Sequence, residues 1–454
     1  MNILVLNGSP KGPNSITLQS MKYLEKIKKD WNFSYFHIAQ KLRKLEEDPE
    51  EAAKAMENAD MLLFSYPVYT FLAPYQMHRF IEIIKDASVD ISGKWGMQFS
   101  TSKHFYDVTA HEFMKENMLD MGLKVLPGLS ADMEDLLTEK GRKELLSWAS
   151  ITEMRIHSDI YEGGAKRNNT SITRSYERTL REVEKTEKGK VSIVTNAESD
   201  DKPLLNMIED FRSSLEYESV VYNIREFSFS GGCISCFSCA KTGKCIHKDG
   251  FDSFLRDKIQ NAVSIVYAYR VKNHFTSSVM KCYDDRQFCN GHRAVTAGTP
   301  TAYIIAGDLS EEENLRTLIK ARASVGGNYL AAVATDEGKT AEEIEKAAKA
   351  LSFAISNKIT EPRNFYGVGG NKIFRDLIYE MRGLMKADHA FYKKNGYYGD
   401  LPQRHKGKIL MMELVGALMS LPGADKKKGM MAKGMLMPYQ KVLDSAMISE
   451  EDNL

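Results

Sequence analysis

Four closely spaced cysteines are the most chemically specific feature of this 454-residue sequence. Cys233, Cys236, Cys239 and Cys245 follow the spacing CxxCxxCx5C. A Thr-Gly turn before the last cysteine would let the four thiolates converge on one centre, and an all-cysteine donor set suits a [4Fe–4S] cluster or tetrahedral zinc. The spacing favours the cluster, because zinc ribbons usually present two separated CxxC pairs. That some or all of these thiols bind nothing stays open as a third interpretation.

A second chemical feature lies near the N-terminus, where a strand ends in Asn7-Gly8-Ser9-Pro10 and a helix opens at Asn14-Ser15. The free N–H groups and the dipole at a helix N-terminus favour an anion such as phosphate. The candidate phosphate donors are Ser9, Lys11, Asn14, Ser15 and Thr17. An ordinary capped turn would use the same residue types. The position after the first strand of a doubly wound sheet, where ligands bind, favours the phosphate site.

Two later loops carry side chains suited to a flavin ring. The first follows a buried strand with aromatic residues that can flank the ring, and the second offers hydrogen-bond donors for its polar edge. The candidates are Pro67, Val68, Tyr69, Thr70 and Phe71 in the first loop and Ser100, Thr101, Ser102 and Lys103 in the second. His104 and Tyr106 follow closely, but a lone loop histidine is more often structural, so no catalytic acid or base is assigned.

Short apolar runs that alternate with helical segments must position these loops. We predict strands at Asn2–Leu6, Phe33–Ile38, Met61–Ser65, Trp95–Ser100 and Leu123–Leu126. Strands separated by helices indicate βαβ units and a right-handed, doubly wound parallel sheet. Five strands in about 130 residues fit the flavodoxin-like variant, whose ligands bind at the carboxyl edge of the sheet.

The same element order returns in the second half of the chain. Predicted strands lie at Val191–Thr195, Ser219–Ile224, Ser264–Val271, Ala302–Ala306 and Tyr329–Thr335. We interpret this as an internal duplication. The predicted fold is therefore α/β, with two five-stranded flavodoxin-like sheets in tandem. The predicted parts are a flavin-binding domain at 1–157, a linker at 158–189, a degenerate domain with the cysteines at 190–358, and a helical extension at 359–454.

The two halves differ in the residues that do chemistry. The phosphate-loop position of the second half holds Glu198, Asp200 and Asp201, which would repel a phosphate dianion. The first half, in turn, has no cysteine. We expect an intrachain pseudo-dimer in which the cysteines of one half approach the flavin of the other. Cys282 and Cys289 are expected to be buried thiols.

The remaining features limit the classes of protein to which this chain could belong. A net charge of +1 gives no signal for nucleic acid. With no signal peptide and no transmembrane segment in the sequence, we expect a cytoplasmic protein. The extension has amphipathic helices predicted near Lys372–Met385 and Lys408–Leu421. Such a tail can lie on a membrane surface, but it more often packs its apolar face across the domains.

The Asn-Gly-Ser-Pro and Asn-Ser pair, followed by Tyr66-Pro67-Val68-Tyr69, resembles the NAD(P)H-dependent FMN reductase and iron–sulfur flavoprotein branch of the flavodoxin-like superfamily. The resemblance covers residues 1–130 and, more weakly, 190–350. It implies that Ser9, Asn14 and Ser15 hold the FMN phosphate and that the two later loops border the ring. It also implies that the four-cysteine segment ligates a [4Fe–4S] cluster.

The predicted function is an FMN-dependent oxidoreductase that moves electrons between NAD(P)H or a reduced carrier and an unnamed acceptor. Use of NAD(P)H rests on the resemblance alone, because no GxGxxG fingerprint follows a strand. The electron partners are small molecules or proteins, and a homo-oligomer stays open. The alternatives are a non-enzymatic electron-transfer protein and a metal-stabilised binding scaffold.

Overall fold

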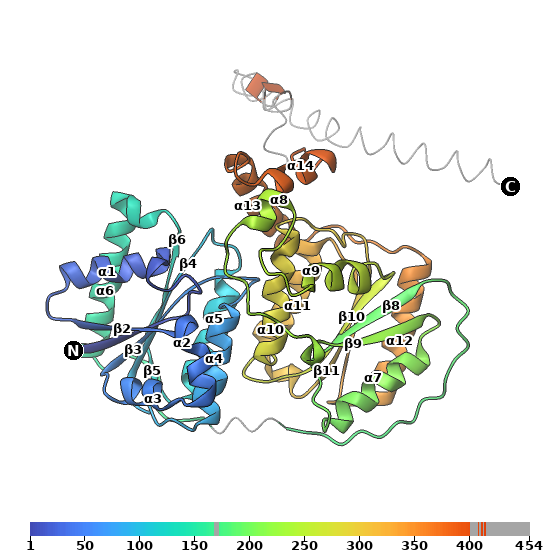
Figure 1. The fold of residues 1–454 in the computed structure, drawn as a ribbon, viewed down its shortest axis with the longest axis horizontal. Helices are drawn as coiled ribbons and strands as arrows, with labels where there is room; N and C mark the ends of the chain where they lie inside the picture. The colour runs from blue at the N-terminus through green and yellow to red at the C-terminus, as the bar shows by residue number, and fades with distance from the viewer. Residues whose placement is uncertain (168–171, 400–406, 408–409, 412, 415–454) are drawn as a thin grey trace, which may run out of the picture. The chain divides into compact units, whose positions relative to one another are not determined.

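The computed structural model of the chain describes residues 1–167, 172–399, 407, 410–411 and 413–414. The chain divides into two units after residue 394, of which the first, residues 1–394, is compact. Both predicted sheets lie in the first unit, each with helices on its two faces (Figure 1). Loops from the two halves can therefore meet within one unit.

The first sheet is parallel apart from one edge strand and has the strand order β2-β1-β3-β4-β5-β7. Its strands are β1 (Asn2–Asn7), β2 (Asn32–His37), β3 (Met61–Pro67), β4 (Trp95–Ser102), β5 (Lys124–Val125), β6 (Leu129–Asp132) and β7 (Glu162–Gly163). The doubly wound parallel sheet is confirmed, with two differences from the predicted five strands. The fifth strand is divided into β5 and β6, which both pair with β4, around Pro127-Gly128, where proline has no N–H for the ladder. In addition, β7 pairs antiparallel with β5.

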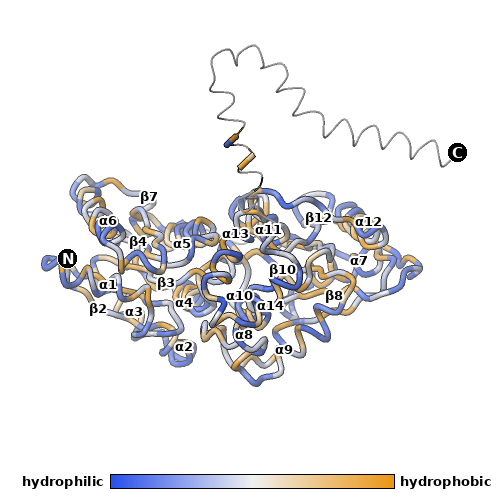
Figure 2. Tube along the Cα trace, turned by 90° about the horizontal axis from the view of Figure 1, so that it is seen from above, coloured by the Kyte–Doolittle hydropathy of each residue, from blue (hydrophilic) through white to orange (hydrophobic). Residues whose placement is uncertain are grey.

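The helices of the first half cover both faces of this sheet. They are α1 (Ile16–Ile27), α2 (Ile38–Glu47), α3 (Glu50–Glu57), α4 (Tyr75–Asp86), α5 (Asp107–Asp120) and α6 (Glu139–His157), with 3-10 turns η1 (Gly12–Asn14) and η2 (Asp135–Leu137). In α1, the buried Leu18, Met21 and Leu24 form one apolar stripe that packs on the sheet. The tube coloured by hydropathy shows hydrophobic and hydrophilic residues following one another along the helices (Figure 2).

The second sheet is wholly parallel and has the order β9-β8-β10-β11-β12. Its strands are β8 (Lys190–Thr195), β9 (Glu218–Asn223), β10 (Ser264–Arg270), β11 (Thr301–Ala306) and β12 (Leu330–Thr335). Counted along each half, both sheets therefore follow the order 2-1-3-4-5 of the flavodoxin-like topology. The shared topology is compatible with a duplication, which stays a prediction.

The second half has helices α7 (Lys202–Ser214), α8 (Ser238–Thr242), α9 (Phe251–Ser253), α10 (Ser278–Arg286), α11 (Glu313–Gly326) and α12 (Thr340–Ser356). Shorter elements are the 3-10 turns η3 (Ile224–Glu226), η5 (Gln287–Asn290) and η6 (Leu309–Glu311) and the π-helical η4 (Phe254–Ile259). The proposed boundaries at 157, 190 and 358 fall at the end of α6, the start of β8 and just after α12.

The two halves pack through topologically equivalent helices. Helices α4 and α10, which follow the third strand of each sheet, contact each other, as do α5 and α11, which follow the fourth. Glu82 on α4 accepts hydrogen bonds from the N–H (2.6 Å) and hydroxyl (2.5 Å) of Ser278 on α10. This packing is compatible with the expected intrachain pseudo-dimer, which stays a prediction.

The extension begins with α13 (Phe365–Glu380) and α14 (Lys386–Lys394). Helix α13 starts earlier than predicted because Asn364 caps it, accepting from the N–H groups of Tyr366 and Gly367. It packs on α11 and reaches the first half, where Phe374 stacks on Phe105 with 4.2 Å between ring centroids. The helix predicted at Lys408–Leu421 lies largely outside the described residues. Among the described helices, none has the length and hydropathy needed to cross a membrane.

Candidate functional site

One cavity of about 190 Å³ is lined by loops of the first half and by the cysteine segment of the second. Its walls come from the loops after β1, β3 and β4, from residues 233–247, and from η5 and α13. The predicted site residues that line it are Ser9, Lys11, Ser15, Thr17, Pro67, Val68, Tyr69, Thr70, Thr101, Ser102, Lys103, Cys233, Cys236, Cys239 and Cys245. Residues more than 200 positions apart in the sequence therefore face the same space.

Three predicted residues do not line this cavity. Asn14 is exposed in η1. Phe71 lines an adjoining cavity instead. Ser100 is buried in β4, where its hydroxyl lies 2.8 Å from Nε2 of His111 on α5.

Asn7 shapes the loop that leads into α1, a role that the sequence analysis did not assign to it. Its side-chain amide donates to the carbonyl of Gly12 (2.9 Å), and its Oδ1 accepts from the N–H of Ser9 (3.1 Å). Gly12 has a φ of +53°, a left-handed conformation that glycine adopts without strain. An amide side chain at the end of a strand, followed by glycine, is the signal that could have identified this role.

The N-terminus of α1 has the donors that a phosphate needs. Ser15 is the N-cap residue, it is buried at the cavity wall, and its side chain makes no capping hydrogen bond. The first-turn N–H groups and the serine hydroxyl can therefore be directed at an anion. The hydroxyl of Thr17, two residues further on, lies 2.6 Å from that of Thr101 and joins this loop to β4. The residues present thus fit the phosphate end of FMN.

Two lysines flank this end of the cavity. Lys103 pairs with Asp132 at 3.0 Å. The ammonium group of Lys11 lies 5.9 Å from the ring centroid of Phe237, which belongs to the cysteine segment of the other half. The phosphate loop and the cysteine segment therefore contact each other directly.

The four clustered cysteines are free thiols that line the cavity. Cys236 is exposed, and the other three are partly buried. Burial raises the pKa of Cys239 to about 11, and the nearby charge of Asp388 adds to the shift. Burial also raises the pKa of Cys233, with smaller contributions from Asp285 and from the neighbouring cysteines. These two thiols are therefore protonated at neutral pH unless a bound cation displaces the proton.

Within the described part of the chain, no group of three or more His, Cys, Asp or Glu side chains is placed to hold a metal ion. The four sulfurs share a cavity wall without forming a ligand set. Their residue type and location suit a metal centre, whereas their present geometry does not.

Several residues that the sequence analysis missed complete the cavity. Phe288, Cys289 and His292 follow α10, and Phe374 lies on α13. Cys289 is buried, as expected, but it also lines the cavity. His292 is oriented by a buried carboxylate, since its Nδ1 lies 2.9 Å from Asp388 on α14. These side chains are brought in by tertiary packing, and no local motif marks them.

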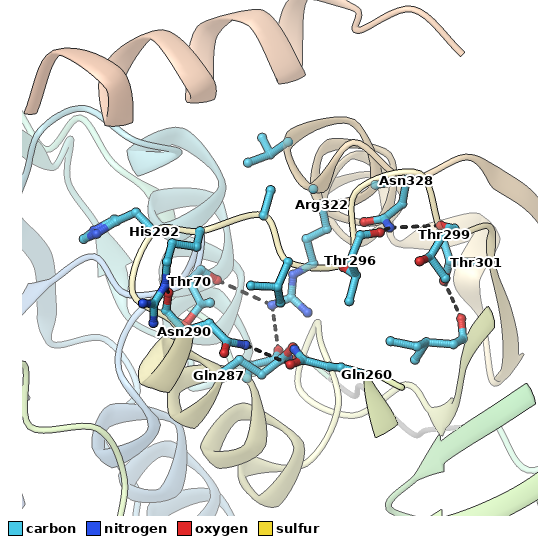
Figure 3. A pocket seen from close by; sticks show the side chains of 18 of the residues that line it. Thr70, Gln260, Gln287, Asn290, His292, Thr296, Thr299, Thr301, Arg322 and Asn328 are labelled. Atoms are coloured by element: carbon cyan, nitrogen blue, oxygen red, sulfur yellow. Dashed lines mark hydrogen bonds and ion pairs between the residues drawn. The ribbon is translucent and has the colours of Figure 1, made fainter. Parts of the chain in front are cut away.

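A second cavity of about 230 Å³ adjoins the first and lies against β10, β11 and α11 (Figure 3). Both cavities are lined by Thr70, Phe105, Phe288, Gly291, His292 and Phe374. The guanidinium of Arg322 lies 2.7 Å from the carboxylate of Asp284 and 3.4 Å from the carbonyl oxygen of Thr70. Arg322 therefore connects the second half to the predicted flavin loop of the first.

The corresponding phosphate position of the second half is filled by its own side chains. Asp201 caps α7 by accepting from the N–H of Leu204 (3.3 Å). Arg270 pairs with the same carboxylate through two hydrogen bonds of 2.6 and 2.8 Å. A paired carboxylate at the N-cap leaves this helix end unsuited to a phosphate.

Comparison with known proteins agrees with this fold. Residues 1–115 match the family model described as "Flavodoxin-like fold". The iron-sulfur flavoprotein of Archaeoglobus fulgidus is 26% identical over 195 residues, which are 41% of this chain and 86% of that protein. The chain is thus an α/β protein whose N-terminal part has a flavodoxin-like fold, and it is similar in sequence to an iron-sulfur flavoprotein.

The similarity of the chain to solved structures is weaker than its similarity to this relative. An FMN-dependent NADH-azoreductase from Bacillus anthracis in complex with FMN has 13% identity and a TM-score of 0.28, covering 34% of this chain and 98% of that one. The NAD(P)H:quinone oxidoreductase from Methanothermobacter marburgensis has 13% identity and a TM-score of 0.28, covering 34% and 96%. Likenesses of this size carry no argument about function.

Proposed function

We propose that this chain is an FMN-dependent oxidoreductase that moves electrons between NAD(P)H, or a reduced carrier, and an acceptor. The observation that carries the proposal is the single cavity lined by the open N-terminus of α1, the loops after β3 and β4, and the cysteine segment. FMN, when bound, supplies hydride and single-electron transfer.

The residues of the chain have distinct tasks in this proposal. The N-terminus of α1, with Ser9 and Ser15, binds the phosphate. The cavity-lining residues of the two later loops, 67–70 and 101–103, border the ring. Phe288 and Phe374 supply apolar walls that exclude water from the cavity.

The four-cysteine segment is proposed to hold a [4Fe–4S] cluster rather than zinc. Support comes from the CxxCxxCx5C spacing, from the shared cavity, and from the name of the Archaeoglobus relative. Because the sulfurs do not form a ligand set here, no electron-transfer step is assigned to a cluster.

Anaerobic purification followed by a visible spectrum and quantification of FMN, iron, sulfide and zinc tests both parts. The proposal expects one FMN per chain, together with iron and sulfide. Cys239→Ser should lose the iron and keep the flavin, whereas Cys282→Ser, a buried cysteine that does not line the cavity, should keep both. Iron-free protein after anaerobic reconstitution would refute the cluster, and flavin-free protein after incubation with FMN would refute the flavin site.

The enzymatic part is tested by steady-state oxidation of NADH and NADPH with a quinone or free flavin as acceptor. Turnover that depends on bound FMN supports the reductase. Reduction by a protein donor alone, with no turnover of NAD(P)H, would make the chain an electron carrier instead.

A further inference from the structure

The loop that borders the proposed flavin ring contains a strained turn. Tyr69 and Leu72 exchange backbone hydrogen bonds of 2.8 and 3.0 Å across it. The two residues between them, Thr70 and Phe71, have φ values of 44° and 72°. Left-handed conformations are unfavourable for residues other than glycine, and most of all for a β-branched residue such as threonine. Such a turn persists only where its surroundings hold it.

Three side chains hold the carbonyl groups of this turn, and two of them come from the other half. Nζ of Lys281 on α10 donates to the carbonyl of Tyr69 at 2.8 Å. Arg322 on α11 donates to the carbonyl of Thr70 at 3.4 Å (Figure 3). Thr109 on α5 donates to the carbonyl of Phe71 at 2.7 Å. Each carbonyl from 69 to 71 thus has a side-chain donor.

Lys281 and Asp285 form a buried ion pair that also holds the side chain of Thr70. The two residues lie one turn apart on α10, and both side chains are fully buried. The Thr70 hydroxyl donates to Asp285 and lies 3.2 Å from Nζ of Lys281. The second oxygen of Asp285 accepts from the N–H of Tyr75, at the start of α4, at 2.8 Å. The pair therefore holds the turn at Tyr69 and Thr70, and it also binds the chain beyond the turn at Tyr75.

A buried ion pair is a poor device for stability alone. Desolvation of two charges offsets most of their attraction, and apolar residues of similar size are often as stable. Burial lowers the pKa of Lys281 and raises that of Asp285, and their mutual attraction opposes both shifts. A pair of this kind is better explained by the conformation that it specifies, which here is the Tyr69–Leu72 turn.

We propose that Lys281 and Asp285 are positioning residues that hold this turn in the shape that receives the flavin. The proposal rests on the function proposed above. It assigns to α10 of the second half a specific task at the FMN site of the first. The second half has no phosphate loop of its own, and in this proposal its role at the FMN site is to hold the flavin-bordering loop of the first half in place.

The test measures FMN affinity of the full-length apoprotein by quenching of flavin fluorescence, beside thermal unfolding. Thr70→Val removes the hydroxyl that binds Asp285, while Thr70→Ser keeps it. Thr70→Val should bind FMN about tenfold more weakly, which corresponds to about 1.4 kcal/mol of binding free energy. The FMN affinity of Thr70→Ser should stay within about threefold of the wild type. Lys281→Met/Asp285→Asn removes both charges together, so that no unpaired buried charge remains, and it should bind about 10- to 100-fold more weakly.

A Thr70→Gly background shows whether Lys281 and Asp285 act by holding the turn or by stabilising the interface between the two halves. Because glycine adopts positive φ without strain, Thr70→Gly relieves the strain at position 70, and the turn then depends less on the clamp. In a Thr70→Gly background, Lys281→Met/Asp285→Asn should therefore weaken FMN binding much less than it does in the wild type. Ser278→Ala is the matched control, since it removes a contact of α10 with α4 that does not touch the turn. It should lower the unfolding temperature and leave FMN affinity unchanged.

Three results would overturn the proposal. The first is a folded Lys281→Met/Asp285→Asn protein that binds FMN as tightly as the wild type. The second is a Ser278→Ala protein that loses as much FMN affinity as this double variant. The third is a double variant that loses as much FMN affinity in the Thr70→Gly background as in the wild type. If the double variant does not fold, the Thr70→Val and Thr70→Ser pair decides, and equal affinities for the two would refute the clamp. Wild-type protein that binds no FMN would refute the proposed function itself, which keeps the two failures distinct.

Discussion

Two N-cap residues account for much of the difference between the halves. Ser15 caps α1, the helix after the first strand of the first sheet, and its side chain makes no capping bond. Asp201 caps α7 at the equivalent place in the second sheet, and it is bound to Leu204 and Arg270. A neutral hydroxyl leaves room for a phosphate dianion, whereas a carboxylate repels it.

Ser15→Asp should convert the first N-cap into the second. Aspartate caps helices as well as serine does, so the unfolding temperature should stay within a few degrees of the wild type. FMN affinity should fall by about 100-fold or more, because the new charge faces the phosphate. Isothermal titration of the apoprotein with FMN provides the measurement.

Asn14→Asp is the matched control for this substitution. It adds the same charge one position earlier, on an exposed residue that does not line the cavity. Its FMN affinity should stay within a few-fold of the wild type. Equal losses in the two variants would show that net charge, and not the position of Ser15, controls binding.

Sequence motifs predicted the residues of the site that lie in local patterns. The cavity-lining serines and threonine near the start of α1, and the four cysteines, were identifiable as candidates because each set lies in one short segment. His292 and Phe374 were not, because they reach the cavity only through the packing of η5 and α13. Neither the clamp at Lys281 nor the loop-shaping role of Asn7 could be inferred from residue type, since both depend on hydrogen-bond partners that the fold supplies.

At the scale of elements, the loop after β10 is tied to both halves by a charged cluster. The ring nitrogens of His274 lie 3.0 Å from Asp120, at the end of α5, and 3.0 Å from Glu312, just before α11. Lys85 on α4 pairs with the same Asp120 at 2.7 Å. Burial lowers the pKa of His274, but the hydrogen bonds and charges of the two carboxylates outweigh it and raise the pKa to about 9.

The elevated pKa makes stability depend on pH in a defined direction. Protonated His274 is favoured in the folded chain, so its contribution is complete below the unfolded value of about 6.5 and is lost as the pH rises through about 9. His274→Gln should therefore cost about 1–3 kcal/mol of unfolding free energy at pH 6 and much less at pH 10. Urea unfolding at both pH values measures this, with the exposed His157→Gln as control. A deficit that is the same at pH 6 and pH 10 would contradict the charged cluster.

Most elements were predictable, and those that differ have local physical causes. The buried strands were recognised as continuous apolar runs, which parallel sheets require. The break between β5 and β6 follows from Pro127-Gly128, and the earlier start of α13 follows from the Asn364 cap. Helix α8, which carries Cys239, is too short for any periodicity to reveal.

At the scale of the whole molecule, one hydrophobic core runs through both halves. It includes Phe80 and Phe113 of the first half and Phe275 and Tyr283 of the second. The repeat of element order was visible in the sequence, but the face through which the halves pack was not. That face is set by α4, α5, α10 and α11, whose apolar surfaces are long-range partners.

A shared core predicts that residues 1–394 unfold as one cooperative unit. Differential scanning calorimetry should give one transition, with the calorimetric and van't Hoff enthalpies in agreement. Two transitions assignable to the separate halves would mean that the interface contributes little, and would contradict the account of α10 as a clamp.

The stoichiometry of FMN binding tests the central claim most directly. In this account the first half supplies the phosphate site, the second half supplies the walls and the clamp, and the second half has no open phosphate site of its own. Titration of the full-length apoprotein with FMN should therefore saturate at one FMN per chain, and Ser15→Asp should weaken binding at that site by about 100-fold or more. Saturation at two FMN per chain, or wild-type FMN affinity in the Ser15→Asp protein, would contradict the account.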